Sequence, residues 1–161
     1  MQVSNFNKKL LIFIFFNIFY AIFYLHYKHH VGNDTSISEW LINYQGGFTR
    51  RGLGGEINIL LANYFSLLFR DAIFFLQAVI HTLYLVLIFF YLKNIRLNIY
   101  QFFALFSPIF LLYPIAELEA LGRKEMLIFL FFVISIIFSG RSFNKIIINS
   151  IILIFFPLLC L

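Results

Sequence analysis

The apolar run AIFFLQAVIHTLYLVLIFFYL, residues 72–92, decides the class of fold. It contains no charged side chain. At a rise of ~1.5 Å per residue it is long enough, as a helix, to cross the ~30 Å hydrocarbon core of a bilayer. Lys93 and Arg96 follow it. Because cytoplasmic loops carry an excess of Lys and Arg, we expect the chain to cross here from the outside to the cytoplasm.

The composition of the whole chain is also that of a membrane protein. Of its 161 residues, 62% are apolar and 12% are charged, whereas soluble domains carry about 25% charged residues. The net charge of +5 does not indicate nucleic-acid binding, because the basic residues stand between apolar runs rather than along one polar face. A single cysteine, Cys160, excludes a disulfide framework and a cysteine metal cluster.

Four further apolar runs indicate additional spans. Lys8 and Lys9 precede the first of them, which we interpret as a retained span rather than a signal peptide, since no small-residue cleavage site follows it. With the N-terminus in the cytoplasm, the predicted spans are 10–25, 72–92, 100–115, 126–139 and 146–161. The chain stops inside the last apolar run, and we therefore expect it to be an N-terminal portion of a longer protein.

The run 57–69 is apolar but only about 13 residues long, which favours a re-entrant or interfacial helix. A crossing there would also place Lys93 and Arg96 outside. The predicted fold is therefore all-α: a polytopic transmembrane helical bundle that forms one integral membrane domain over residues 1–161. Its external segment, 26–71, is expected to contain short helices.

Two features of this external segment have local interpretations. Ser36 to Glu39 fits the capping-box pattern, which predicts a short helix with three residues on one interfacial face: Trp40, Leu41 and Tyr44. Three histidines are close enough on a helical continuation to hold a metal ion: His26, His29 and His30. We favour a helix end at the headgroups for them, and we predict no metal site.

The densest glycine cluster is GGFTRRGLGGE, residues 46–56, which holds five of the chain's eight glycines. Glycine lets the backbone approach a ligand closely, and arginine adds a planar charged fork suited to phosphate. A helix is predicted to begin directly afterwards, at Glu56–Ile57, so that its N-terminal dipole faces the same place. We therefore predict a phosphate-binding loop that uses these residues: Gly46, Gly47, Arg50, Arg51 and Gly52. The alternative is that the two arginines only meet lipid headgroups.

A second charged turn, AELEALGRKE at 116–125, is predicted on the same external side. Arg123 and Lys124 would lie on the same side as Arg50 and Arg51, and the two clusters would bind one polyanion between them. A lipid-linked diphosphate sugar fits this arrangement, because its tail lies in the bilayer and its phosphates lie at headgroup depth.

All seven acidic residues are external in this topology. Sugar transfer needs one carboxylate that takes a proton from the acceptor hydroxyl, together with cations that stabilise the leaving phosphate. Asp34, in the loop soon after the first span, and Glu117, after the proline-containing span, are the two candidates for this base. Asp34 could equally cap a turn.

Two short motifs, Tyr44–Leu53 and Gly122–Glu125, resemble polytopic inner-membrane proteins encoded in bacterial O-antigen and capsule clusters. Those proteins are similar in layout to Wzy-like polysaccharide polymerases and to GT-C glycosyltransferases. The resemblance implies that an acid in the first external loop, Asp34, is catalytic. It also implies that external arginines bind the lipid-linked glycan: Arg50, Arg51 and Arg123. The implied location is the bacterial inner (cytoplasmic) membrane.

We therefore predict a protein of cell-surface polysaccharide assembly that transfers or polymerises sugars at the external face, from an undecaprenyl-phosphate-linked donor and without a cofactor. The expected partners are a lipid-linked sugar or oligosaccharide, membrane lipids and other polysaccharide-assembly proteins, and not nucleic acid. Two alternatives stay open. One is a transporter or flippase-type protein that binds the same lipid without chemistry, and the other is a non-catalytic membrane subunit.

Overall fold

The computed structural model describes residues 2–31, 35–47, 52–95, 97–117 and 119–139, together with Ser150 and Leu153. This part of the chain is all-helical, with seven helices and no strand. The predicted site residues Asp34, Arg50 and Arg51 and nearly all of the predicted span 146–161 lie outside the described residues.

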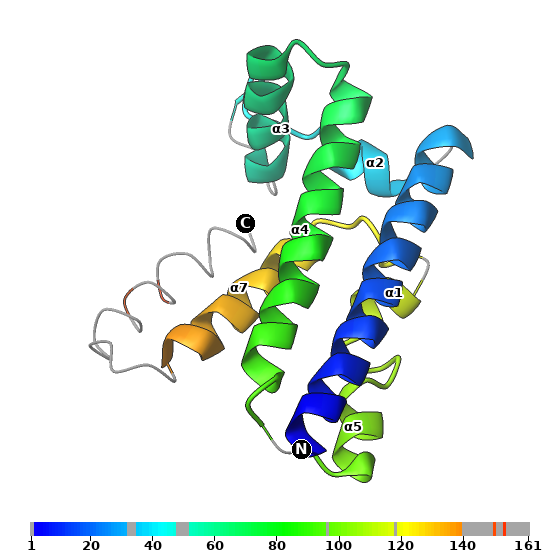
Figure 1. The fold of residues 1–161 in the computed structure, drawn as a ribbon. Coiled ribbons are helices and arrows are strands. Elements are labelled where there is room, and N and C mark those ends of the chain that lie inside the picture. The colour runs from blue at the N-terminus through cyan, green and yellow to red at the C-terminus, as the bar shows by residue number, and fades with distance from the viewer. Residues whose placement is uncertain are drawn as a thin grey trace.

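Two long helices, α1 (Gln2–Val31) and α4 (Phe69–Leu92), pack side by side in antiparallel directions (Figure 1). His29, near the end of α1, hydrogen-bonds Gln77 in the first half of α4, whereas Lys8 and Phe89 line one cavity at the other end of the pair. Both helices are long and apolar enough to cross a membrane by length and composition. They contain the predicted spans 10–25 and 72–92.

The two helices meet along narrow stripes at helical spacing. Leu10, Ile14, Ala21 and Leu25 form the buried stripe of α1, and the stripe of α4 includes Ile73, Ile80, Tyr84 and Ile88. Only 22% of the most apolar window of α1 and 39% of that of α4 is buried. A core helix of a soluble protein would be mostly buried, whereas in each of these two windows fewer than half of the residues are buried.

The predicted span 100–115 is not one helix. α5 (Ile99–Leu105) begins at a capping box between Asn98 and Gln101, and α6 (Tyr113–Ala116) follows after a turn. The reason is Pro108, which has no N–H and whose ring would clash with the preceding helical turn. The turn is held instead by two hydrogen bonds. The Leu111 N–H donates to the Leu105 carbonyl at 3.1 Å, and the Tyr84 hydroxyl donates to the Leu111 carbonyl at 2.9 Å.

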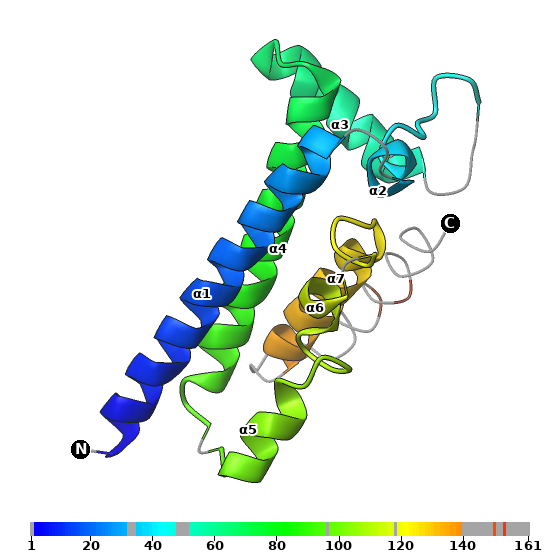
Figure 2. The ribbon, with the colours of Figure 1, turned by 90° about the vertical axis from the view of Figure 1, so that its right-hand side faces the viewer.

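α7 (Glu125–Ser139) matches the predicted span 126–139 in position, as an apolar helix of 15 residues that packs on α4. Figure 2 shows α5, α6 and α7 on one side of the α1–α4 pair. Phe13 of α1 contacts the rings of Phe102 and Phe106 edge-on, which holds the α5 region against α1.

The short helices α2 (Thr35–Glu39) and α3 (Gly52–Phe65) lie at the end of the pair where α1 finishes (Figures 1 and 2). α2 confirms a short helix near the capping-box pattern. However, Trp40, Leu41 and Tyr44 follow it in turns and do not share a helical face, and Trp40 is buried rather than interfacial. α3 ends where Ser66 takes a positive φ of 52°, and it packs against α4.

The start of α3 corrects the predicted helix start at Glu56–Ile57. Gly52, Gly54 and Gly55 lie inside the first turns of this helix, and all three are buried. A Cβ at Gly52 would overlap the ring of Tyr44, and one at Gly55 would overlap the backbone carbonyl of Ile42. Three of the five clustered glycines therefore allow the 40–44 segment to approach a helix closely.

We expect Gly55→Ala to lower the free energy of unfolding by about 1–3 kcal/mol, because the added methyl group forces apart two backbone segments. Gly46→Ala is the matched control, since nothing lies within 4 Å of its added Cβ. Thermal unfolding of the purified chain measures both. Equal midpoints for the two variants would contradict the close packing of α3 on the 40–44 segment.

Candidate functional site

The carbonyl of Gly122 joins three parts of the fold. It accepts a hydrogen bond from Nε1 of Trp40 at 2.6 Å and another from Nε2 of Gln77 at 2.7 Å. Trp40 follows α2, Gln77 belongs to α4, and Gly122 lies in the turn before α7. Gly122 itself has a φ of 89°, which favours glycine because a Cβ is strained there.

The same turn is also held by α1. Nζ of Lys28 donates a hydrogen bond to the carbonyl of Leu121 at 3.0 Å. Nε2 of His29 and Oε1 of Gln77 are 2.9 Å apart, so that Gln77 connects α1 to the Gly122 carbonyl. Gln77 and His29 are buried, and a buried polar group is costly unless it is paired. These contacts therefore fix the 119–124 turn at one position along the α1–α4 pair.

The glycine cluster 46–56 and the charged turn 116–125 were predicted to act together, and they lie close to each other at Gly54 and Lys124. A Cβ at Gly54 would lie 3.2 Å from Cε3 of Trp40 and 3.3 Å from Cε of Lys124. The stem of Lys124 thus runs beside the first turn of α3, and the side chain is only 7% exposed. Phosphate binding by Arg50 and Arg51 stays a prediction.

The predicted binding glycines lie in two different settings. Gly46 and Gly47 are exposed in a turn in which Gly47 N–H donates to the Tyr44 carbonyl at 3.0 Å, and Gly47 has a φ of 116°. Gly52 is buried against the ring of Tyr44. Packing therefore explains Gly52, and turn geometry explains Gly47, whereas a role for these glycines in phosphate binding stays a prediction.

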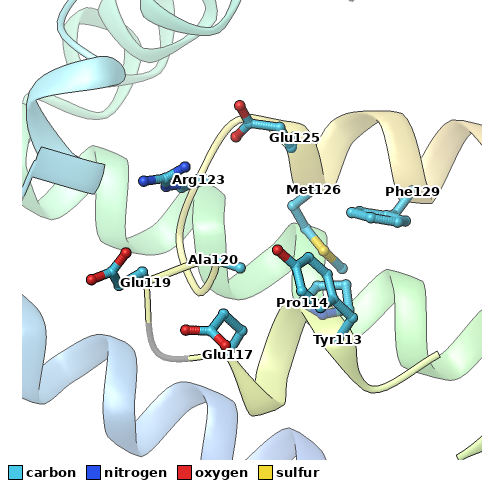
Figure 3. A pocket seen from close by; sticks show the side chains of 9 residues that line it. All are labelled: Tyr113, Pro114, Glu117, Glu119, Ala120, Arg123, Glu125, Met126 and Phe129. Carbon is cyan, nitrogen blue, oxygen red and sulfur yellow. The ribbon is translucent and has the colours of Figure 1, made fainter. Parts of the chain in front are cut away.

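A cavity of about 230 Å³ lies beside the 119–124 turn. Figure 3 shows its charged side chains around the turn and its apolar side chains at the start of α7 and α6. The predicted residues Glu117 and Arg123 both line it, whereas Lys124 does not. The full lining is Tyr113, Pro114, Glu117, Glu119, Ala120, Arg123, Glu125, Met126 and Phe129.

This cavity combines groups that can do different chemistry. Glu117 and Glu119 are exposed carboxylates that can accept protons or hydrogen bonds, and the guanidinium of Arg123 can bind an anion. The Nε atom of Arg123 is enclosed and has no hydrogen-bond partner within the described part of the chain. Among those residues, no three or more His, Cys, Asp or Glu side chains are grouped so that they could hold a metal ion.

Sequence reasoning missed Gln77, Glu119 and Tyr113. A signal for Gln77 was present, because a polar residue inside a long apolar run is costly in a membrane and often has a specific partner. Nothing in the sequence distinguished Glu119 from the neighbouring acids, since its place at the cavity depends on how the turn is folded.

Because the Gly122 carbonyl has two donors, we expect the effects of losing them to be non-additive. Trp40→Phe or Gln77→Leu alone leaves the carbonyl one partner, whereas the double variant leaves a buried acceptor unpaired, at an added cost of about 1–3 kcal/mol. A double-mutant cycle on the free energy of unfolding measures this coupling. Trp40→Phe combined with Asn98→Ala, at the α5 cap, is the control pair and should be additive. Additive effects in the first cycle would contradict a shared acceptor.

Comparisons of the chain with protein-family models, with curated proteins and with solved structures found no match.

Proposed function

We propose that the chain is a multi-pass membrane protein of bacterial cell-surface polysaccharide assembly, which handles a polyprenyl-phosphate-linked sugar at the external face. The proposal has three parts: a membrane location, a site at headgroup depth, and a sugar-transfer chemistry in that site. Each part is supported by a different set of contacts.

The outer surface of α1 supports the membrane location. Between Lys9 and Lys28, residues 10–27 rise by about 27 Å, close to the ~30 Å hydrocarbon core of a bilayer. The one polar amide in this stretch, Asn17, donates to the carbonyl of Phe13 at 2.8 Å and so is paired within its own helix. Apart from His26 near its end, the strongly exposed residues between the lysines are apolar or aromatic: Leu11, Ile12, Phe15, Phe16, Phe19, Tyr20, Phe23 and Tyr27.

The hydrogen bond from Lys28 to the Leu121 carbonyl is the observation that carries the proposal. Lys28 marks the end of the apolar stretch of α1, where a membrane protein meets the lipid headgroups. If α1 crosses the bilayer, this bond supports a position at headgroup depth for the 119–124 turn and the cavity beside it. A polyprenyl phosphate presents its phosphate at this depth while its tail stays among the acyl chains.

The cavity supports the chemistry. Glu117 would take the proton from an acceptor hydroxyl as that oxygen attacks the sugar, and the bond between the sugar and its phosphate would break. Arg123 would stabilise the negative charge that develops on the leaving phosphate. Asp34 is the alternative base, and Arg50 and Arg51 would add positive charge. Lys124 would add a further charge from the α3 side of the turn.

We expect the two ends of the α1–α4 pair to lie on opposite sides of the membrane. Gln45, near the start of α3, and Asn94, after α4, are both exposed and lie at opposite ends. In a Cys160→Ser background, a membrane-impermeant thiol reagent added from outside should label Gln45→Cys and spare Asn94→Cys. Labelling of both positions from one side would contradict the membrane location.

We expect Glu117→Gln to lower sugar transfer at least about 100-fold, because a general base contributes roughly 10²–10⁴-fold to a rate. The measurement is transfer from a polyprenyl-phosphate-linked sugar by membranes that contain the full chain. Asp71→Asn, an exposed carboxylate outside the cavity, is the matched control and should retain activity.

Asp34→Asn in the same assay decides between the two candidate bases. If neither change affects transfer, the assignment of a catalytic carboxylate is wrong. A chain that binds the lipid-linked sugar but transfers nothing, before or after substitution, would be a transporter or a binding subunit.

A further inference from the structure

The charges of the cavity do not suit a ligand that is only anionic. The cavity is lined by three carboxylates, those of Glu117, Glu119 and Glu125, and by one guanidinium, that of Arg123. Glu125 has a further interaction of its own, so the exposed carboxylates of Glu117 and Glu119 share the cavity with one cation. Phosphate groups alone would be placed among more negative charges than positive ones, and like charges at short range repel. A fitting ligand therefore carries a cationic group as well as an anionic one.

The arrangement of the carboxylates indicates which kind of cationic group the ligand carries. Figure 3 shows Glu117 and Glu119 on one side of the turn and Glu125 on the other, with Arg123 between them. Within the described residues, the acidic side chains do not group as the ligands of one metal ion. A primary ammonium group has three N–H donors that can bond separate carboxylates. Unlike a metal ion, it does not need these carboxylates to point at one centre.

The anionic part of the ligand has a partner in Arg123. Its Nε atom is enclosed without a hydrogen-bond partner among the described residues, although it lines a cavity. An enclosed donor of this kind is costly unless a ligand or water satisfies it, and guanidinium groups bind phosphate oxygens strongly. The cavity, at about 230 Å³, is smaller than the ~300–1,000 Å³ of sites for drug-sized ligands, which favours a small polar head.

An apolar track leads away from the polar part. Met126 and Phe129 line the cavity at the start of α7, and Phe132 and Ile136 continue along that helix. Phe129, Phe132 and Ile136 have the spacing of one helical face. Phe132 and Ile136 are 45% and 50% exposed. This face offers a surface on which a hydrocarbon chain can lie while its head occupies the cavity.

We propose that the cavity binds an amphiphile whose head carries a primary ammonium group next to a phosphate. Glu117 and Glu119 accept hydrogen bonds from the ammonium group, Arg123 binds the phosphate, and the hydrocarbon chain lies along α7. Two sources have this chemistry: a phospholipid with an ethanolamine head, and a polyprenyl phosphate that carries an amino sugar. The second source rests on the proposed function, whereas the first requires only the membrane location.

The test measures binding of defined lipids to the delipidated full chain in detergent. Phosphatidylethanolamine should bind at least about tenfold more tightly than phosphatidylcholine, whose quaternary ammonium has no N–H donor. It should also bind more tightly than phosphatidylglycerol, which is only anionic. In the second arm, a polyprenyl phosphate that carries an amino sugar should bind more tightly than its N-acetylated form.

Substitutions of lining residues test whether the ammonium lipid binds in this cavity. Arg123→Ala and Glu119→Gln should each weaken binding of the ammonium lipid about tenfold, since a hydrogen bond to a charged group is worth roughly that much. Arg70→Ala and Asp71→Asn remove the same charges outside the cavity and should leave binding unchanged. Circular dichroism checks that each variant is folded, and Glu119→Gln, on an exposed side chain, carries the test if Arg123→Ala does not fold.

The two arms separate the possible outcomes. Preference for the amino sugar alone assigns the cavity to the lipid-linked substrate. Preference for phosphatidylethanolamine alone assigns it to a membrane lipid, whether or not the transfer assay succeeds. Equal binding of amine and non-amine lipids in both arms, or variants that bind as the unaltered chain does, would overturn the inference.

Discussion

The carbonyl of Gly122 is the point on which the arrangement of the described helices depends. Through Trp40 it holds the segment that follows α2, and through Gln77 it holds α4, while Lys28 of α1 bonds the neighbouring carbonyl of Leu121. A backbone carbonyl that is buried needs partners, and each of these partners comes from a different part of the chain. The position of the cavity follows from these bonds, because Arg123 and Glu119 belong to the same turn and Glu117 and Glu125 flank it.

The described helices bury several polar side chains beside an apolar core and expose many large apolar ones. Gln77, His81, Asn58 and Lys124 are buried, whereas large apolar side chains of α1 and α4 are exposed. In lipid, a polar side chain is stabilised by facing a polar partner inside the protein, and an apolar one loses nothing by facing the acyl chains.

Much of the fold was predictable from residues that act locally. The runs 10–25 and 72–92 predicted the two long helices, because apolar length alone indicates a helix that can cross a bilayer. Pro108 also acts locally, and its presence should have counted against one continuous helix over 100–115. The glycines of α3 were harder to interpret, because glycine serves a flexible loop and a tight helix contact equally well. Only the positions of Tyr44 and Ile42 show that Gly52 and Gly55 make close contacts.

By itself, the sequence determined that the described chain is helical, where its two long apolar helices lie, and that Glu117 and Arg123 belong to one charged turn. These properties depend on composition and on neighbours a few residues apart. Only the tertiary structure decided that Trp40 and Gln77 bond this turn. It also decided that Lys124 lies beside α3 while Arg123 lines the cavity, and that carboxylates outnumber the cation in that cavity. The reason is that hydrogen bonds between residues 45 and 82 positions apart set these directions, and no local pattern in the chain encodes such pairings.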